Sequence, residues 1–189
     1  MNRRHLVPVA LWAAAACASA QAGAGFTFNG KPIHPGCLSE MRALLSDSLP
    51  ANVVVDLEGC GYGTNRHFGN VTAEKGLVTW KEEGREGGHN GAPTFAYRHL
   101  GVLANGVHVV QTFESGGGSG IFESLLLLRF ENDRAFEEDH YRQRPLLKLV
   151  GERSLGDRAE TEIHLKGNEI TIRVVKSGEK PEVQTIKVE

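Results

Sequence analysis

The sequence carries little net charge, and beyond its N-terminal segment it has no long hydrophobic run. Its 21 lysine and arginine residues almost balance 23 aspartate and glutamate residues, which leaves a formal net charge of −2. Proteins that bind nucleic acid normally need a basic face, so we expect no nucleic-acid partner. A membrane-spanning helix needs about 18 or more consecutive apolar residues, and we therefore expect no transmembrane segment in the mature chain.

Motifs that mark common catalytic and metal sites are also missing from the sequence. It contains neither His-Glu-x-x-His nor Cys-x-x-Cys, the spacings that bring metal ligands together. Ser119 has Gly117 two positions before it but Ile121 two positions after it, so the nucleophile motif Gly-x-Ser-x-Gly is not met. Glu137 and His140 would share one face of a helix, as in some metal sites, and a solvated acidic loop is the alternative. We predict no catalytic residue, no metal and no cofactor.

The N-terminal segment has the three parts of a secretory signal peptide. Arg3 and Arg4 supply the positive start, Leu6–Cys17 is an apolar stretch, and Ala18–Ala20 has the small-x-small pattern at which signal peptidase cuts. A segment this short and rich in alanine is typical of bacterial export, so we expect the protein in the periplasm.

Cleavage is expected between Ala20 and Gln21, which removes residues 1–20 and leaves a single β-rich domain over 24–189. A second position for the cut follows Ala22. The alternative is a lipoprotein anchored through an acylated Cys17, for which the usual leucine three positions earlier is missing.

Cysteine is scarce, and only Cys37 and Cys60 remain after cleavage. An even number of cysteines in an oxidising compartment predicts a disulfide. Cys37 begins a predicted helix and Cys60 follows a predicted strand. These two ends meet if the helix runs antiparallel to the strand, so we predict one Cys37–Cys60 bond.

One helix is predicted, from about Cys37 to Leu49. Its apolar side chains recur at helical spacing and its opposite face is polar, so the helix should lie with one side on a sheet. Pro35 suits its first turn and Pro50 should end it. The apolar positions are Leu38, Met41, Leu45 and Leu49.

The rest of the chain predicts strands and turns, in keeping with 23 glycines among 189 residues. Asn29-Gly30 and Asn105-Gly106 predict two-residue hairpin turns, and Glu74–Gly76 a three-residue loop. Leu125–Leu128 is apolar on both faces and predicts a central strand, whereas Asn132–Arg144 is charged and ambiguous. We expect a mainly β (α+β) fold, an antiparallel β-sandwich or barrel of about ten strands with one N-terminal helix packed on it.

A glycine-rich loop between two predicted strands is the strongest candidate for a binding site. Its length and glycine content exceed what a turn between two strands requires, and glycine lets the backbone approach a ligand closely. A plain connection between strands is the alternative. The candidate residues are Ser115, Gly116, Gly117, Gly118, Ser119 and Gly120.

The Asn105-Gly106 turn predicts which side chains accompany this loop. A two-residue turn pairs residues whose numbers sum to a constant, so Tyr97 would lie opposite Glu114 at the base of the loop. With His99 and Thr112 these residues would form a polar and aromatic patch. His99 and His108 would share that face but lie four positions, or about 13 Å, apart, too far for one metal.

The run from Gln111 to Phe130 resembles periplasmic lysozyme inhibitors, which insert a Ser/Gly loop into a lysozyme cleft. The resemblance is confined to this run, and the disulfide-anchored helix departs from those proteins. We expect an exported, non-enzymatic periplasmic binding domain whose partner is a protein or small ligand of the cell envelope, and an inhibitor or immunity role is a special case. The alternatives are a periplasmic hydrolase with a dispersed His/acid site and an envelope structural or assembly protein.

Overall fold

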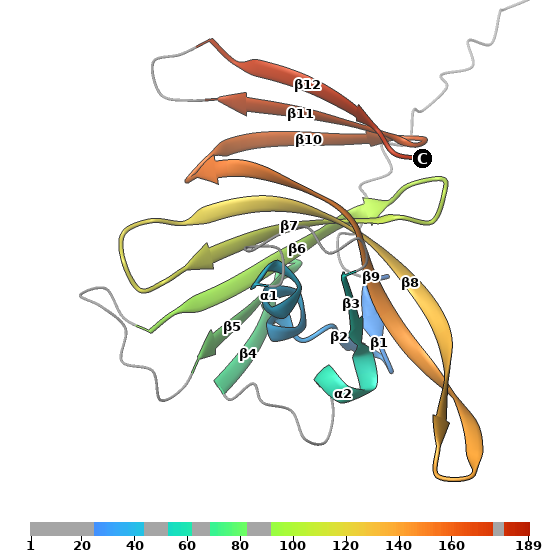
Figure 1. Ribbon diagram of the computed structural model, residues 1–189. Helices are drawn as coiled ribbons and strands as arrows, with labels where there is room; N and C mark the ends of the chain where they lie inside the picture. The colour runs from blue at the N-terminus through green and yellow to red at the C-terminus, as the bar shows by residue number, and fades with distance from the viewer. Residues whose placement is uncertain (1–24, 44–52, 62–68, 83–91, 176–179) are drawn as a thin grey trace, which may run out of the picture.

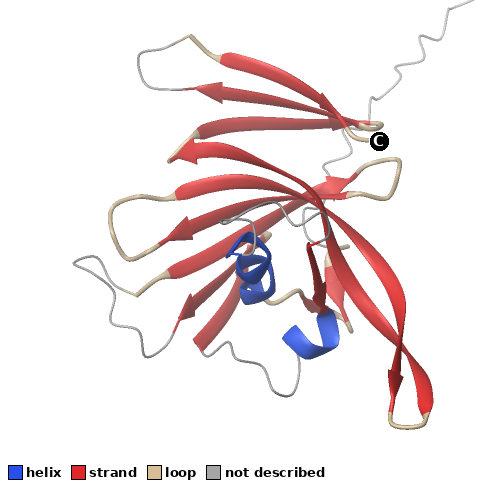
Figure 2. Ribbon diagram, viewed as in Figure 1, coloured by secondary structure: helices blue, strands red, loops and turns tan. Residues whose placement is uncertain are grey.

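The computed structural model describes residues 25–43, 53–61, 69–82, 92–175 and 180–189. In these residues the protein is mostly β-strand with two short helices, which confirms the mainly β prediction (Figures 1 and 2). The predicted signal peptide, its cleavage between Ala20 and Gln21, and the alternative anchor at Cys17 lie outside the described residues. Within the described ranges, no helix is long and apolar enough to cross a membrane.

The strands form two antiparallel sheets and a separate small hairpin. The large sheet has the order β3-β9-β8-β7-β6-β5-β4, and the small sheet has the order β10-β11-β12. The hairpin consists of β1 (Thr27–Phe28) and β2 (Lys31–Pro32). The large sheet contains β3 (Val53–Asp56), β4 (Gly69–Glu74), β5 (Leu77–Glu82), β6 (Thr94–Val102), β7 (His108–Ser115), β8 (Phe122–Glu137) and β9 (His140–Asp157). The small sheet contains β10 (Glu160–Lys166), β11 (Glu169–Val175) and β12 (Glu182–Lys187).

Each face of the large sheet contributes to a hydrophobic core. Helix α1 (Pro35–Ala43) covers one face, where Leu126 and Leu128 of β8 join its core. The small sheet covers the other face, where Leu125 joins a second core and Leu127 packs against it. The alternating leucines of β8 therefore contribute to two cores, one on each face of the sheet, which confirms the predicted central strand.

The predicted disulfide between Cys37 and Cys60 is confirmed. It links α1 to the short helix α2 (Leu57–Gly61), with 5.8 Å between the two Cα atoms. Leu38 and Met41 of α1 are fully buried beside it, as the helical pattern predicts. The predicted continuation of the helix through Leu45 and Leu49 lies outside the described residues.

Of the first two predicted turns, the one at Asn29-Gly30 is confirmed and the one at Glu74–Gly76 is not. Asn29 and Gly30 both have positive φ, 49° and 74°, and Phe28 pairs with Lys31, as the predicted two-residue turn requires. Lys75 and Gly76 also form a two-residue turn, because Glu74 pairs with Leu77, so the predicted three-residue loop is wrong.

The predicted β6–β7 turn is also wrong. The Leu103 amide donates to the Val107 carbonyl oxygen, which leaves a three-residue loop in which Gly106 alone has positive φ. Asn105 is held by tertiary bonds, since its backbone amide donates to Asn168 Oδ1 and its side-chain Nδ2 donates to the Val188 carbonyl oxygen. Within the loop, its Oδ1 accepts from the Val107 amide at 3.3 Å. These contacts with the small sheet favour the longer loop.

A β-bulge between His99 and Gly101 moves the β6–β7 register further. Gly101 has φ 153°, and a Cβ there would lie 3.0 Å from Leu165 Cδ1 of β10. Glycine therefore allows the small sheet to approach the bulge. As a result Tyr97 pairs with Thr112 and His99 with Val110, so the predicted register is wrong.

The ambiguous segment from Asn132 to Arg144 is strand at both ends. It belongs to the outer half of a long β8–β9 hairpin that extends away from the sandwich (Figure 1). Among the described strands, β7 pairs with β8 only as far as Leu128, and β3 pairs with β9 only from Leu146 onward. Residues 132–145 therefore extend beyond these neighbouring strands, and we call them the arm.

Candidate functional site

The glycine-rich loop joins the ends of β7 and β8. Glu114 pairs with Phe122, so residues 115–121 form the connection. Gly116, Gly118 and Ser119 are exposed. A Cβ added to Gly116 or Gly118 would meet no atom within 4 Å, and neither has positive φ. Packing and backbone geometry therefore do not explain why these two positions are glycine.

The other glycines of the loop have structural reasons. Gly117 has φ 85°, a backbone conformation that residues with a side chain rarely adopt. Its amide donates to Ser115 Oγ at 3.4 Å. A Cβ at Gly120 would lie 3.3 Å from the Phe122 ring. Gly117 is therefore required by its backbone conformation, whereas a side chain at position 120 would need the exposed Phe122 ring to shift by a few tenths of an ångström.

The C-terminal end of the loop is fixed to the β9–β10 turn. The Ile121 amide donates to Asp157 Oδ1 at 2.8 Å, and its carbonyl oxygen accepts from the Arg158 amide at 2.8 Å. The bond from the Ile121 amide lowers the pKa of Asp157, which keeps this acceptor ionised at neutral pH. The loop is therefore held at its base.

Two exposed apolar side chains follow the loop directly. Ile121 is 41% exposed and Phe122 is 56% exposed. Exposed hydrophobic side chains next to one another often mark an interaction surface. We call Ser115–Gly120 together with Ile121 and Phe122 the loop patch. The sequence identified the loop but not these two residues, since their alternation with β8 core positions resembled an ordinary strand.

Tyr97 does not lie beside the loop, because Phe95 takes the position opposite Glu114. The Tyr97 ring is only 1% exposed, and its hydroxyl donates to the Ile33 carbonyl at 2.8 Å. Burial raises the pKa of Tyr97, so this phenol stays neutral. Thr112 is fully buried as well. The predicted polar and aromatic patch at the base of the loop is therefore wrong, because α1 and the N-terminal hairpin cover the face that carries Tyr97 and Thr112.

Glu114 is the one member of that patch that stays at the base of the loop. Arg42 of α1 forms an ion pair with Glu114 and donates from Nε to Glu152 at 3.1 Å. The three side chains link α1 to β7 and β9 next to the loop patch. Glu114 thus contributes to positioning the loop, and its carboxylate is already engaged.

His99, which is buried, and His108, which is half-buried, lie together beside Phe26, not about 13 Å apart as predicted. His108 Nδ1 is 3.2 Å from His99 Nε2. Phe26 stacks on His99 with ring centroids 5.3 Å apart, and Phe130 meets His108 edge-on at 4.9 Å. Burial, and then the charge of His99, lower the pKa of His108 to about 4. Burial also lowers the pKa of His99.

The acidic run around Glu137 and His140 is the tip of the arm. Glu137 pairs with His140 across a two-residue turn in which Glu138 has φ 55°. The exposed tip confirms the solvated acidic loop and contradicts a helical metal pair. In the part of the chain that the structure describes, no group of three or more His, Cys, Asp or Glu side chains could hold a metal ion.

Comparisons of the chain with family models, with curated proteins and with solved structures find no match. The similarity of Gln111–Phe130 to lysozyme inhibitors therefore gains no support from them. Any function must be argued from the surfaces of the protein itself.

Proposed function

We propose that this protein is an exported, non-enzymatic binding domain that contacts another protein of the cell envelope through its loop patch. The observation that carries the proposal is the exposed Phe122, which follows a loop whose exposed glycines at 116 and 118 are required neither by packing nor by backbone geometry. Aromatic side chains beside accessible backbone are common at protein interfaces.

The anchoring of the loop supports this proposal. Asp157 and Arg158 hold Ile121, and the Arg42–Glu114 ion pair lies at the other end of the loop. A loop that is ordered before binding loses less conformational entropy on binding. An inhibitor or immunity role is a special case, in which the loop enters the cleft of the partner.

Two features support export to the periplasm. The N-terminal segment from Met1 to Ala20 has the pattern of a cleaved signal peptide. The Cys37–Cys60 disulfide is typical of proteins that fold in an oxidising compartment.

Site-specific photo-crosslinking in periplasmic extract tests the proposed function. A photoreactive phenylalanine analogue at Ser119 lies in the loop patch, and the same analogue at the exposed Thr185 of β12 is the control. We expect a discrete adduct from Ser119 that disappears when Phe122→Ser is added, and none from Thr185. Equal labelling at both positions, or no adduct from Ser119, would contradict the proposal.

A further inference from the structure

The arm offers an unpaired strand edge. From Asn132 to Pro145 its two strands pair only with each other, and it projects from the sandwich (Figure 1). Among the described strands, none pairs with β8 beyond Leu128 on the side away from β9. The backbone N–H and C=O groups along this edge are therefore available to another strand.

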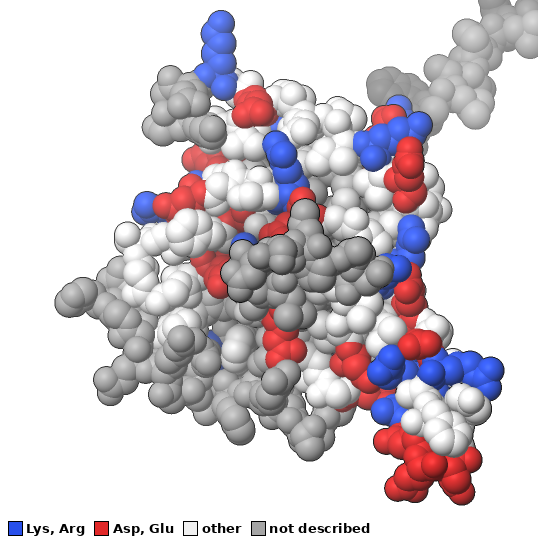
Figure 3. All heavy atoms as spheres, in the orientation of Figure 1, with Lys and Arg blue, Asp and Glu red and all other residues white. Residues whose placement is uncertain are grey.

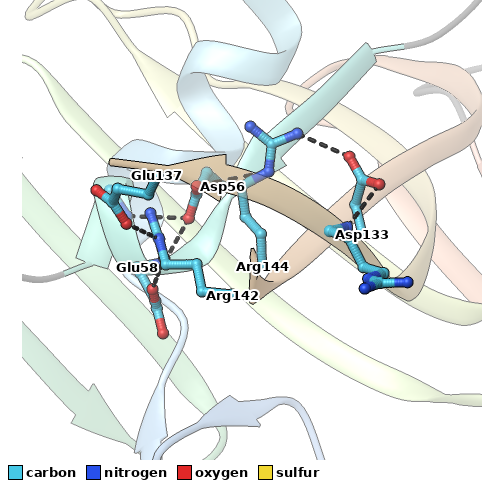
Figure 4. Close-up of polar contacts among 8 residues, drawn as sticks. Asp56, Glu58, Asp133, Glu137, Arg142 and Arg144 are labelled. Carbon is cyan, nitrogen blue, oxygen red and sulfur yellow. Dashed lines mark hydrogen bonds and ion pairs between the residues drawn. The ribbon is translucent and has the colours of Figure 1, made fainter. Parts of the chain in front are cut away.

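One face of the arm carries ordered rows of charge. On β9, Arg144 lies 2.8 Å from Asp133 of β8 and 4.0 Å from Asp56 at the end of β3. Arg142 of β9 likewise forms ion pairs with Glu137 of β8 and Glu58 of α2 (Figure 4). The basic row of β9 thus lies between two acidic rows.

The acidic row of β8 has a basic neighbour on one side only. Lys148 extends the pattern toward the body, 3.4 Å from Glu131. The carboxylates of Asp133 and Glu137 remain about half exposed, at 53% and 54%. In Figure 3 acidic side chains gather at the tip of the arm, with basic side chains next to them toward the body. A strand added beside β8 would therefore complement this acidic row in charge if its side chains on the same face were basic.

The opposite face of the arm is aromatic. Phe136 and Tyr141 are directly paired across the hairpin, with ring centroids 5.0 Å apart, and they are 62% and 63% exposed. The Arg134 guanidinium lies 4.8 Å from the centre of the Tyr141 ring. A strand added beside β8 would place its apolar side chains next to Phe136.

The arm is braced before any partner arrives. Its Arg142 and Arg144 hold Glu58 and Asp56 of the body, and α2 is joined to α1 by the Cys37–Cys60 disulfide. Bracing lowers the entropy lost when a partner binds.

We propose that the β8 edge between Asn132 and Glu137 accepts an extended segment of a partner protein in which basic and apolar residues alternate. The segment pairs with β8 as an additional strand, its basic side chains lie along Asp133 and Glu137, and its apolar side chains contact Phe136. Strand addition takes affinity from backbone hydrogen bonds and specificity from alternate side chains. This surface is separate from the loop patch and does not depend on it.

A second copy of the chain fits this edge less well. Two identical strands that pair antiparallel about a two-fold axis keep the same faces together, so the acidic row would meet its own copy. Like charges directly opposite are destabilising. Charge complementarity therefore favours a basic segment over self-association.

Fluorescence anisotropy with defined peptides tests the proposal on the full mature chain. The probe is a labelled peptide of alternating lysine and valine, and its controls are a glutamate–valine peptide and the lysine–valine peptide with every backbone nitrogen methylated. We expect the first to bind at least tenfold more tightly than either control. If the methylated peptide binds as well as the probe, charge alone attracts it and strand addition is refuted.

Variants locate the binding on the protein. Glu137→Gln and Phe136→Ser should each weaken binding of the lysine–valine peptide several-fold, and hydrogen exchange should slow at residues 132–137 in the complex. Val183→Ser is the matched control, since Val183 is also 62% exposed but lies on β12. An equal loss in the control, protection confined to β12, or no binding of the probe overturns the proposal. Circular dichroism checks that each variant is folded. If a variant is unfolded, hydrogen exchange of the unchanged protein with and without the peptide still shows whether residues 132–137 bind it.

Discussion

His108 Nδ1 lies 3.2 Å from His99 Nε2, although regular pairing from an Asn105-Gly106 turn would separate the two rings by about 13 Å. The longer β6–β7 loop and the bulge before Gly101 together place His99 opposite Val110. His108 is two residues from Val110 on the same strand face, so the rings become diagonal neighbours. Two small backbone irregularities thus bring together a buried His99 and a half-buried His108.

The histidine pair should make stability depend on pH. Because its pKa is about 4 in the folded state and ordinarily 6.5, His108 takes up a proton more readily in the unfolded chain. The free energy of unfolding should therefore fall as pH decreases from about 6.5 to about 4, by on the order of 2–3 kcal/mol for this residue. Urea denaturation at pH 7 and pH 4.5 measures the difference. His108→Gln should lose this part of the slope, and an unchanged slope would show that the pair does not titrate as described.

Loss of the disulfide should destabilise the protein. Cys37→Ser should lower the free energy of unfolding by roughly 2–4 kcal/mol, because the bond restricts the unfolded chain. Both thiols should resist alkylation until they are reduced. Cys60→Ser should have about the same effect as Cys37→Ser, and the double variant should add little to either. Rapid alkylation of the purified, unreduced protein would contradict the bond.

The glycine-rich loop should be dispensable for folding. Replacing residues 115–121 by Asn-Gly joins Glu114 to Phe122 through a two-residue turn and leaves both cores intact. The bonds of Ile121 to Asp157 and Arg158 are lost, so we expect a decrease in stability of about 1–2 kcal/mol by thermal or urea unfolding. A shortened variant that folds but, added in excess, does not suppress the adduct that the parent forms through the analogue at Ser119 supports binding by the loop. If it cannot fold, the glycines serve the geometry of β7 and β8 instead.

A buried carboxylate should oppose stability at higher pH. Glu123 is 7% exposed between the two sheets, and Gln111 Nε2 donates to it at 2.9 Å. Burial raises the pKa of Glu123, so its favourable contribution is present below the ordinary glutamate pKa and is lost as pH rises. The stability of Glu123→Gln relative to the unchanged protein should therefore increase between pH 4 and pH 7. The matched control is the same substitution, Glu169→Gln, at an exposed position of β11.

Features that depend on neighbouring residues could be predicted from the sequence. Asn29-Gly30 adopts its predicted turn because both positions need positive φ, which is a local property. The alternation of apolar side chains identified most strands, and the leucines of β8 indicated a strand covered on both faces. The Cys37–Cys60 bond was predicted from the two cysteines that follow the N-terminal segment and from the places of Cys37 at a helix start and Cys60 after a strand.

Tertiary structure alone decided the features in which distant segments compete with local preference. Asn105 forms a longer loop because Asn168 and Val188 supply its hydrogen bonds, and these partners come from the small sheet and the C-terminus. Tyr97 is buried because α1 and the hairpin β1–β2 cover its face of β6, whereas the sequence predicts it in a patch at the base of the glycine-rich loop. The charged arm continues the β8–β9 pairing outward, and its arginines meet carboxylates on β3 and α2. Sequence periodicity does not record which distant segments will meet.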